Sequence, residues 1–414
     1  MELNFSKLTT KSGVSLWVLP ISYSRTVAAG VLINAGTRDE NWPKEAGIAH
    51  ALEHMFLQGT KNFPTQRDLT SYIEEIGGAI NAWTAKEMTF CYVQVPAFEK
   101  ERAVRILSEQ LRESLFLEEK VPVEMKNIVQ EIRRRNDNPQ RFIGQIANQF
   151  LYKNHPLSKD TLGTEESVLS FTRNDLISFK ERYYNSSNFT FIIAGGITAE
   201  EALNLFESYF PERSELKPNL RAIDNIVDGE EKKLIKNKDI EQVHVYLSAR
   251  ISPAKEKETL YLDFFRTMIA GGMSFPLFQE VRDRRGLCYE IWANITKWSD
   301  IGSFVVYIGT DPKRYKEAID TAIEVISKSA ADEDLLTKVK NLKIGRLDLL
   351  YQNTRDIIDI AARDIAFVGE PRGYDQIVKE IKEVNIDNIK NVVDRYLKPE
   401  MLYTTMLVPN DFKE

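Results

Sequence analysis

Two histidines and a glutamate stand close together in residues 47–57, where they could hold a metal ion and activate water. His50 and His54 are two of the four histidines in 414 residues, and they are four positions apart. On a helix they project from one face, one turn from each other, close enough to share one ion. Glu53 lies beside that ion rather than on it, within reach of a water molecule. The stretch therefore predicts a zinc site with two imidazole ligands and Glu53 as the general base.

The third protein ligand has to come from another element, and the helix predicted at about residues 118–136 carries two candidates. Glu124 and Glu131 are seven positions apart, nearly two helical turns, and therefore share a face. An acidic residue on a helix usually faces solvent, but the incomplete ligand set upstream favours Glu131. Apolar neighbours such as Ile128 and Ile132 indicate that this helix also packs against a core.

A second pair of polar residues lies in the C-terminal half of the chain. Arg282 and Tyr289, seven positions apart, could hydrogen-bond a substrate carbonyl and the oxyanion that develops when water attacks it. Taken alone, an arginine such as Arg282 is more often a surface ion-pair partner, and a tyrosine such as Tyr289 is more often a core residue of a strand. The pair gains its meaning only from the rest of the chain.

The elements that must position these residues repeat along the chain. Residues 174–194 resemble residues 387–408 at an offset of 213, and the helix predicted at residues 258–270 takes the place of the His50 helix in the second copy, without a histidine. Such self-similarity indicates two related structural units. We therefore predict an α+β fold of two similar halves, each a mostly antiparallel sheet with helices packed on it, joined by a linker into a clamshell. Residues 1–212 form the metal-bearing half, residues 213–228 the linker, and residues 229–414 the second half.

Composition limits the classes of partner. A net charge of −6 and a pI near 5.6 argue against nucleic acid. Cys91 and Cys288 are the only cysteines, so we expect neither a disulfide framework nor a cysteine metal site. We find no signal peptide and no apolar stretch long enough to span a membrane, and we predict a cytoplasmic protein.

The motifs together resemble one family. In His50-Ala51-Leu52-Glu53-His54 the glutamate precedes the second histidine, which is the inverted arrangement of the inverzincins. Glu131 follows His54 by 77 positions, and the segments 77–82, 155–165 and 282–289 also match the family pattern. Over essentially its whole length the chain resembles the pitrilysin-type zinc peptidases, in the two-domain form of the mitochondrial processing peptidase β subunit and similar bacterial peptidases.

The resemblance implies a role for each residue. His50, His54 and Glu131 are expected to bind one Zn²⁺ per chain, with Glu53 as the base. Glu124 is expected to support the ligands from behind, while Arg282 and Tyr289 reach the scissile peptide bond from the second half. The strand at Asn81 and Ala82 is expected to accept an extended peptide as an added strand.

The resemblance also implies a function, with alternatives. We expect a metallopeptidase that hydrolyses unfolded peptides or oligopeptides in a closed chamber between the halves. Because one chain carries both the metal motif and the Arg/Tyr pair, we expect a homodimer; a heterodimer with a paralogue is the alternative. A dedicated precursor-processing peptidase and a non-catalytic peptide-binding clamshell are the other functions open to such a chain.

Overall fold

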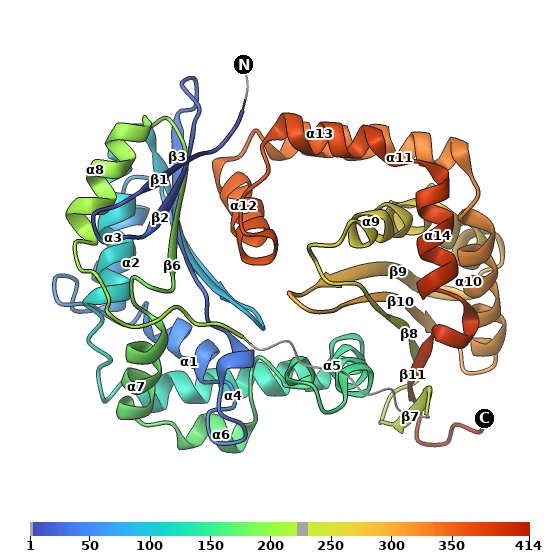
Figure 1. Ribbon diagram of the computed structural model, residues 1–414. Coiled ribbons are helices and arrows are strands. Elements are labelled where there is room, and N and C mark those ends of the chain that lie inside the picture. Colours follow the sequence, from blue (N-terminus) through green and yellow to red (C-terminus); the bar gives the residue numbers. More distant parts are fainter. Residues whose placement is uncertain (1–2, 222–230) are drawn as a thin grey trace. The chain divides into compact units, whose positions relative to one another are not determined.

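The computed structural model describes residues 3–221 and 231–414, which form two units with one β-sheet each (Figure 1). The first unit takes the described parts of Met1–Arg133, Lys159–Ala222 and Leu347–Ile377. The second takes those of Arg134–Ser158, Ile223–Arg346 and Val378–Glu414. Each unit therefore contains a segment from the other half of the chain.

In the described part of the first unit, the sheet has six strands in the order β1-β2-β6-β3-β5-β4, antiparallel except for the parallel pair of β2 and β6. The strands are β1 (Ser6–Thr9), β2 (Ser15–Pro20), β3 (Thr26–Ile33), β4 (Ala79–Thr84), β5 (Thr89–Pro96) and β6 (Phe189–Gly195). Strands β3 and β5 are almost wholly buried, as central strands covered on both faces are. Strand β4 forms one edge, and its residues are exposed or half-buried.

Helices pack around this sheet. They are η1 (Thr37–Asp39), α1 (Ile48–Met55), α2 (Gln66–Glu74), η2 (Ala97–Glu99), α3 (Lys100–Arg112), α4 (Val121–Asp137), α6 (Glu165–Ser170), α7 (Arg173–Tyr183), α8 (Ala199–Tyr209) and α12 (Thr354–Val368). The last turn of α4 belongs to the second unit.

In the described part of the second unit, the sheet has five strands in the order β7-β11-β8-β10-β9, antiparallel except for the parallel pair of β7 and β11. The strands are β7 (Lys233–Asn237), β8 (Val243–Ile251), β9 (Cys288–Lys297), β10 (Gly302–Thr310) and β11 (Tyr403–Val408). The helices are α5 (Pro139–Tyr152), η3 (Pro156–Ser158), α9 (Lys257–Ala270), the π-helix η4 (Phe278–Arg284), α10 (Tyr315–Ser329), α11 (Glu333–Leu350), α13 (Tyr374–Glu383), α14 (Ile386–Tyr396) and η5 (Pro399–Met401). The ends of α11 and α13 reach into the first unit.

The two sheets share one topology. Strands β2, β6, β3, β5 and β4 follow each other in the first sheet as β7, β11, β8, β10 and β9 do in the second. The single parallel pair has the same place in both sheets. This correspondence confirms the predicted α+β fold of two similar halves with mostly antiparallel sheets.

One helix from each half packs on the sheet of the other half (Figure 1). Helix α12, from the C-terminal half, contacts β3, β6 and β5. Helix α5, from the N-terminal half, contacts β8 and β11, the strands that correspond to β3 and β6. The exchange is thus reciprocal, and neither half of the chain covers its own sheet alone.

The predicted division of the chain assigned contiguous residues to each half, and the observed units differ from it by these exchanged segments. Periodicity predicts that residues 139–152 form a helix but not which sheet that helix covers. Of the predicted linker, residues 222–228 lie outside the described residues, and residues 213–221 contain no helix or strand. The boundaries near residues 212 and 228 stay a prediction.

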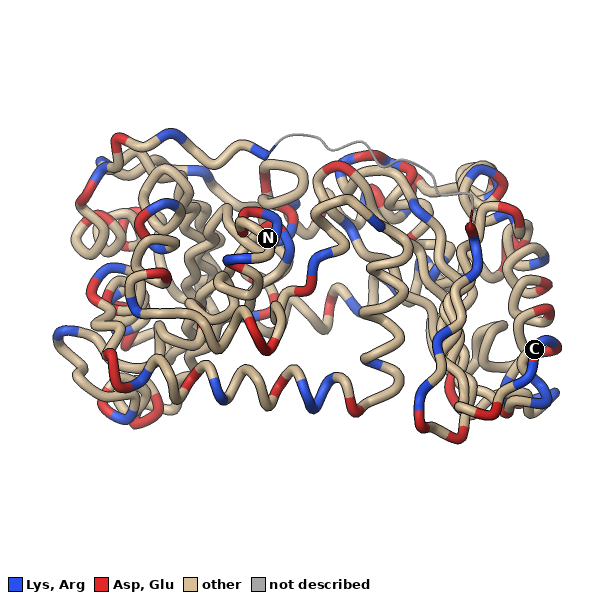
Figure 2. Tube along the Cα trace, turned by 90° about the horizontal axis from the view of Figure 1, so that it is seen from below, with Lys and Arg blue, Asp and Glu red and all other residues tan. Residues whose placement is uncertain are grey.

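Charge is distributed without a long run of one sign. Figure 2 shows acidic and basic positions interspersed along the trace. Within residues 3–221 and 231–414, every helix is too short or too polar to span a lipid bilayer.

Candidate metal centre and active site

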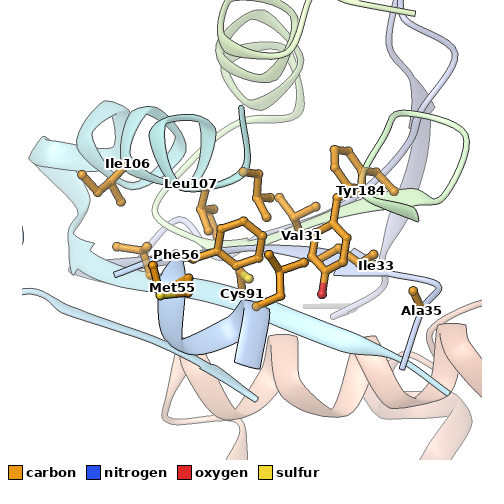
Figure 3. Close-up of a cluster of buried hydrophobic side chains, with 14 of the residues drawn as sticks. Val31, Ile33, Ala35, Met55, Phe56, Cys91, Ile106, Leu107 and Tyr184 are labelled. Atoms are coloured by element: carbon orange, nitrogen blue, oxygen red, sulfur yellow. The ribbon is translucent and has the colours of Figure 1, made fainter. Parts of the chain in front are cut away.

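Helix α1 presents its polar side chains on one face because its other faces are buried. Glu53 and His54 come three and four positions after His50, which places the three side chains on one face of the helix. Leu52 and Met55 are fully buried. Figure 3 shows this apolar side of the helix packed in the cluster that contains Cys91, Leu107 and Tyr184.

The two histidines meet Glu131 from α4. One ligand atom each of His50, His54 and Glu131 lies within 4.8 Å of the others. The Nε2 atom of His50 is 3.7 Å from Oε2 of Glu131, and Nε2 of His54 is 3.9 Å from the same oxygen. Ligands in a tetrahedral zinc site stand roughly 3.3 Å apart. The structure therefore brings together the three residues that the sequence predicts as ligands, at nearly the spacing that zinc needs.

The surroundings of the histidines suit a metal. Burial, and secondarily the neighbouring His54, lower the pKa of His50 to about 3. His50 is therefore neutral at physiological pH, as a metal-bound imidazole must be. Nδ1 of His54 lies 3.3 Å from Oε2 of Glu124. Glu124 thus stands behind a ligand, where a carboxylate fixes the orientation of the ring.

Glu53 lies near His54 and Glu131, but it is not part of the ligand cluster. Its carboxylate accepts a 2.5 Å hydrogen bond from Oγ1 of Thr84, the last residue of β4. Burial raises the pKa of Glu53, and the bond from Thr84 acts in the opposite direction. A carboxylate with a raised pKa is a stronger base, and the bond to Thr84 holds it in one orientation.

The predicted substrate residues lie on β4, the edge strand nearest to α1 in sequence order. Asn81 pairs with Tyr92 and Ala82 with Cys91 of β5. The other side of the strand has no neighbour in the described sheet. The side chain of Asn81 accepts a hydrogen bond from the amide of Ala82 at 2.9 Å. An open edge can pair with an extended chain, but nothing in this geometry assigns Asn81 or Ala82 to a substrate.

In the second unit, Arg282 and Tyr289 lie together. The Arg282 guanidinium is 5.1 Å from the centre of the Tyr289 ring. Arg282 lies on the π-helix η4, and Tyr289 is the extra residue of a β-bulge, because Gly309 of β10 pairs with Glu290 and Thr310 pairs with Cys288. The Tyr289 side chain is 75% exposed. π-Helices and bulges recur at functional sites, where they re-aim side chains. That either residue reaches a bound peptide stays a prediction.

Two residues that contact helix α1 were not predicted. Thr84 is 31 positions from Glu53 in the chain, and Glu40 hydrogen-bonds the first amides of α1. Thr84 is the last residue of a strand that the sequence predicts, but the sequence does not show that its hydroxyl group bonds to Glu53. Contacts of this kind depend on how a strand and a loop pack against a helix.

The chain thus combines an α+β fold in two related halves with a cluster of two histidines from α1 and a glutamate from α4, a donor set that suits a metal ion. Two family models cover most of the chain. Residues 18–165 match the insulinase model of peptidase family M16, and residues 170–343 match the model described as the peptidase M16 inactive domain. The chain belongs to the M16 peptidases, the pitrilysin-type family, as its motifs predict.

Relatives match over nearly the full length. The chain is 28% identical to an uncharacterised zinc protease of Rickettsia felis, with all of both chains covered. It is 29% identical to an uncharacterised zinc protease of Mycobacterium leprae, over 90% of this chain and 85% of that one. A peptidase M16 inactive domain from Pseudomonas fluorescens has the same fold, with a TM-score of 0.90 at 16% identity over 100% of both chains.

Proposed function

We propose that this protein is a zinc-dependent endopeptidase of the inverted His-x-x-Glu-His type that hydrolyses unfolded peptides or oligopeptides. The observation that carries the proposal is the convergence of His50, His54 and Glu131, with half-buried Glu53 beside them. These donors fit one zinc ion per chain, since they offer two neutral imidazoles and one carboxylate and leave a fourth position for water or substrate. The zinc proteases among the relatives support the same metal.

Glu53 is the proton carrier in this proposal. A bound zinc ion supplies a Lewis acid that polarises the scissile carbonyl and lowers the pKa of water. Glu53 accepts a proton from the attacking water and returns it to the departing amine, so the base becomes the acid within one turnover. Thr84 keeps the carboxylate turned toward that water through the bond to Oε2.

Strand addition explains how such an enzyme binds many sequences. A peptide paired with β4 would be held by backbone hydrogen bonds at Asn81 and Ala82, after displacing the Asn81 side chain from the Ala82 amide. Arg282 and Tyr289 would donate to the developing oxyanion. Only an unfolded segment can present a free backbone to an edge strand.

The family resemblance extends the proposal to the assembly. It supports a clamshell whose two halves close into a chamber, a homodimer, and a cytoplasmic location. Exclusion by size from such a chamber would spare folded proteins.

A second candidate is a non-catalytic clamshell that binds peptides or a partner subunit, or pairs as a heterodimer with an active paralogue. The match of residues 170–343 to an inactive-domain model favours it. The ligand cluster lies outside those residues, however, and it is complete. A precursor-processing peptidase would use the same site on a narrower substrate.

Hydrolysis of a quenched fluorescent peptide library tests the proposal. We expect the purified protein to cleave unstructured peptides, to lose this activity with a chelator, and to regain it with one equivalent of zinc. Zinc bound without cleavage of any peptide would favour the non-catalytic clamshell. Cleavage of one sequence only would favour the processing peptidase.

A further inference from the structure

The carboxyl group of Glu40 is buried against the start of helix α1. Glu40 is 8% exposed. Its Oε2 accepts hydrogen bonds from the Gly47 amide at 2.9 Å and from Nε1 of Trp42 at 3.1 Å. Its Oε1 accepts one from the Ala49 amide at 3.1 Å. Two backbone amides from the start of α1 and one indole N–H from the preceding loop therefore converge on one side chain.

Helix α1 needs this acceptor because it has no cap of its own. Its N-cap is Gly47, which has φ 90° and no side chain. A Cβ at this position would stand 2.6 Å from the carbonyl oxygen of Leu162 and 2.9 Å from Cα of Gly163. The close approach of the 162–163 turn thus excludes the serine, threonine or aspartate that normally accepts from the first amides.

Four other helices of the first unit have the side-chain cap that α1 lacks. Thr65, Thr164, Thr172 and Thr198 cap α2, α6, α7 and α8 with their own hydroxyl groups. None of these four helices carries a predicted zinc ligand. Helix α1 differs from these four helices, because its first amides bond to Glu40, seven positions before the N-cap Gly47.

The bond to the Ala49 amide matters for the metal centre because Ala49 directly precedes His50. An eight-residue helix is too short to be stable by itself, so its place depends on contacts at both ends. Apolar packing of Met55 and Phe56 fixes the C-terminal end. The Glu40 carboxyl fixes the N-terminal end.

We propose that Glu40 is a positioning residue, which holds helix α1 where His50, His54 and Glu131 converge. The effects on zinc affinity and hydrolysis rest on the proposed function, but the effect on the helix does not. Ligands must be held within about 0.5 Å for full affinity. Loss of the bonds at the start of α1 would therefore weaken zinc binding, because the ligands would be held less precisely although none is removed.

The test compares Glu40→Gln with Glu109→Gln in the full chain. Glu109 is the matched control, since it is 7% exposed and accepts only neutral donors, from Thr60 and Asn62, without touching the first turn of α1. A glutamine at position 40 places an amide nitrogen against one of the two backbone amides and loses that bond. Three quantities are measured: amide hydrogen exchange at Gly47 and Ala49 in the metal-free protein, zinc affinity by competition with a chelator, and cleavage of an unstructured peptide.

With Glu40→Gln we expect exchange at Gly47 and Ala49 to be about tenfold faster and zinc affinity to fall about tenfold. Glu109→Gln should change neither quantity more than twofold. Glu40→Asp, which can still reach one amide, should give an intermediate result and carries the test if Glu40→Gln does not fold.

Exchange and zinc affinity within twofold of the wild type for both Glu40 variants would overturn the proposal. Equal losses in Glu109→Gln would also overturn it, because the effect would then be general destabilisation. If the wild type binds zinc but cleaves nothing, the proposed function fails while exchange and affinity still decide the role of Glu40.

Discussion

Helix α1 of the first unit and helix α9 of the second follow equivalent strands, β3 and β8, but their polar side chains have different partners. On α1, two imidazoles face the Glu131 carboxylate, with one ligand atom of each residue within 4.8 Å of the others. On α9, the carboxylate of Asp263 accepts hydrogen bonds from Lys343 at 2.8 Å and Arg266 at 2.9 Å. Burial acts to raise the pKa of Asp263, yet Lys343 and its neighbouring cations hold it well below its ordinary range.

The comparison shows what makes one copy of a repeated scaffold fit for a metal. Both helices are anchored by buried apolar side chains. The second copy closes its carboxylate into ion pairs with Lys343 and Arg266, whereas the first gathers ligand atoms of three residues that metals bind. The two polar residues predicted to act from the second unit, Arg282 and Tyr289, lie at a π-helix and a bulge instead.

The largest expected effect is that of removing the base. Glu53→Gln keeps the shape of the side chain but cannot accept a proton, so we expect kcat for peptide hydrolysis to fall about 10³-fold while zinc content stays unchanged. Glu258→Gln on α9 is the control in the other copy, where the carboxylate pairs with Arg395 and Tyr396. Its kcat should stay within twofold. Full activity of Glu53→Gln would contradict the role of Glu53.

The contribution of the second unit can be isolated with Tyr289→Phe, which removes only a hydroxyl group. If that hydroxyl stabilises the oxyanion, kcat falls about 10²-fold with zinc affinity unchanged. Tyr23→Phe changes another exposed tyrosine, in the first unit, and should leave kcat unaltered. Equal kcat for both variants would remove Tyr289 from the site.

The cap of α1 predicts a pH dependence of stability. Burial raises the pKa of Glu40 from 4.5 to about 8, against the bonds from Gly47 and Ala49 and the charge of Lys86. Below pH 4.5 the group is protonated in both states. Between pH 4.5 and 8 only the unfolded chain loses this proton, so the free energy of unfolding falls with pH, by at most about 1.4 kcal/mol per unit. Denaturant unfolding across this range should show a shallower dependence in Glu40→Gln, and the same slope in both proteins would contradict the raised pKa.

The exchanged helix α12 should contribute a smaller amount to stability. Asp359 on α12 accepts a 2.8 Å hydrogen bond from Trp83 of β4 and a 3.0 Å bond from Arg363. We expect Asp359→Ala to lower the free energy of unfolding by about 1 kcal/mol. Asp356→Ala on the same helix, where the side chain is 43% exposed, should change it by no more than about 0.5 kcal/mol. Equal effects would show that α12 does not stabilise β4 through Trp83.

Spacing along the chain was sufficient for the motif and for the two-fold repeat. His50, His54 and Glu131 could be selected because helical periodicity and metal chemistry constrain which residue types can converge. The likeness of the two halves followed from the matching segments, whereas the order of the strands in each sheet was not predicted.

Contacts between distant segments could not be predicted in this way. Helical periodicity does not say which sheet α5 and α12 cover, because the choice of the sheet of the other half depends on packing between segments far apart in the chain. Likewise, the sequence shows Glu40 as an acidic loop residue. Its role depends on the turn at residues 162–163, which excludes any side chain at Gly47.

The most direct test of the account counts zinc atoms per chain in the wild type and in His54→Ala, purified without chelator and measured by mass spectrometry of the metal. The first unit alone has a donor cluster among the described residues, so we predict close to one zinc in the wild type and close to none in the variant. Two zinc ions in the wild type, or an unchanged count in His54→Ala, would contradict the claim that only the α1 copy of the repeat binds the metal.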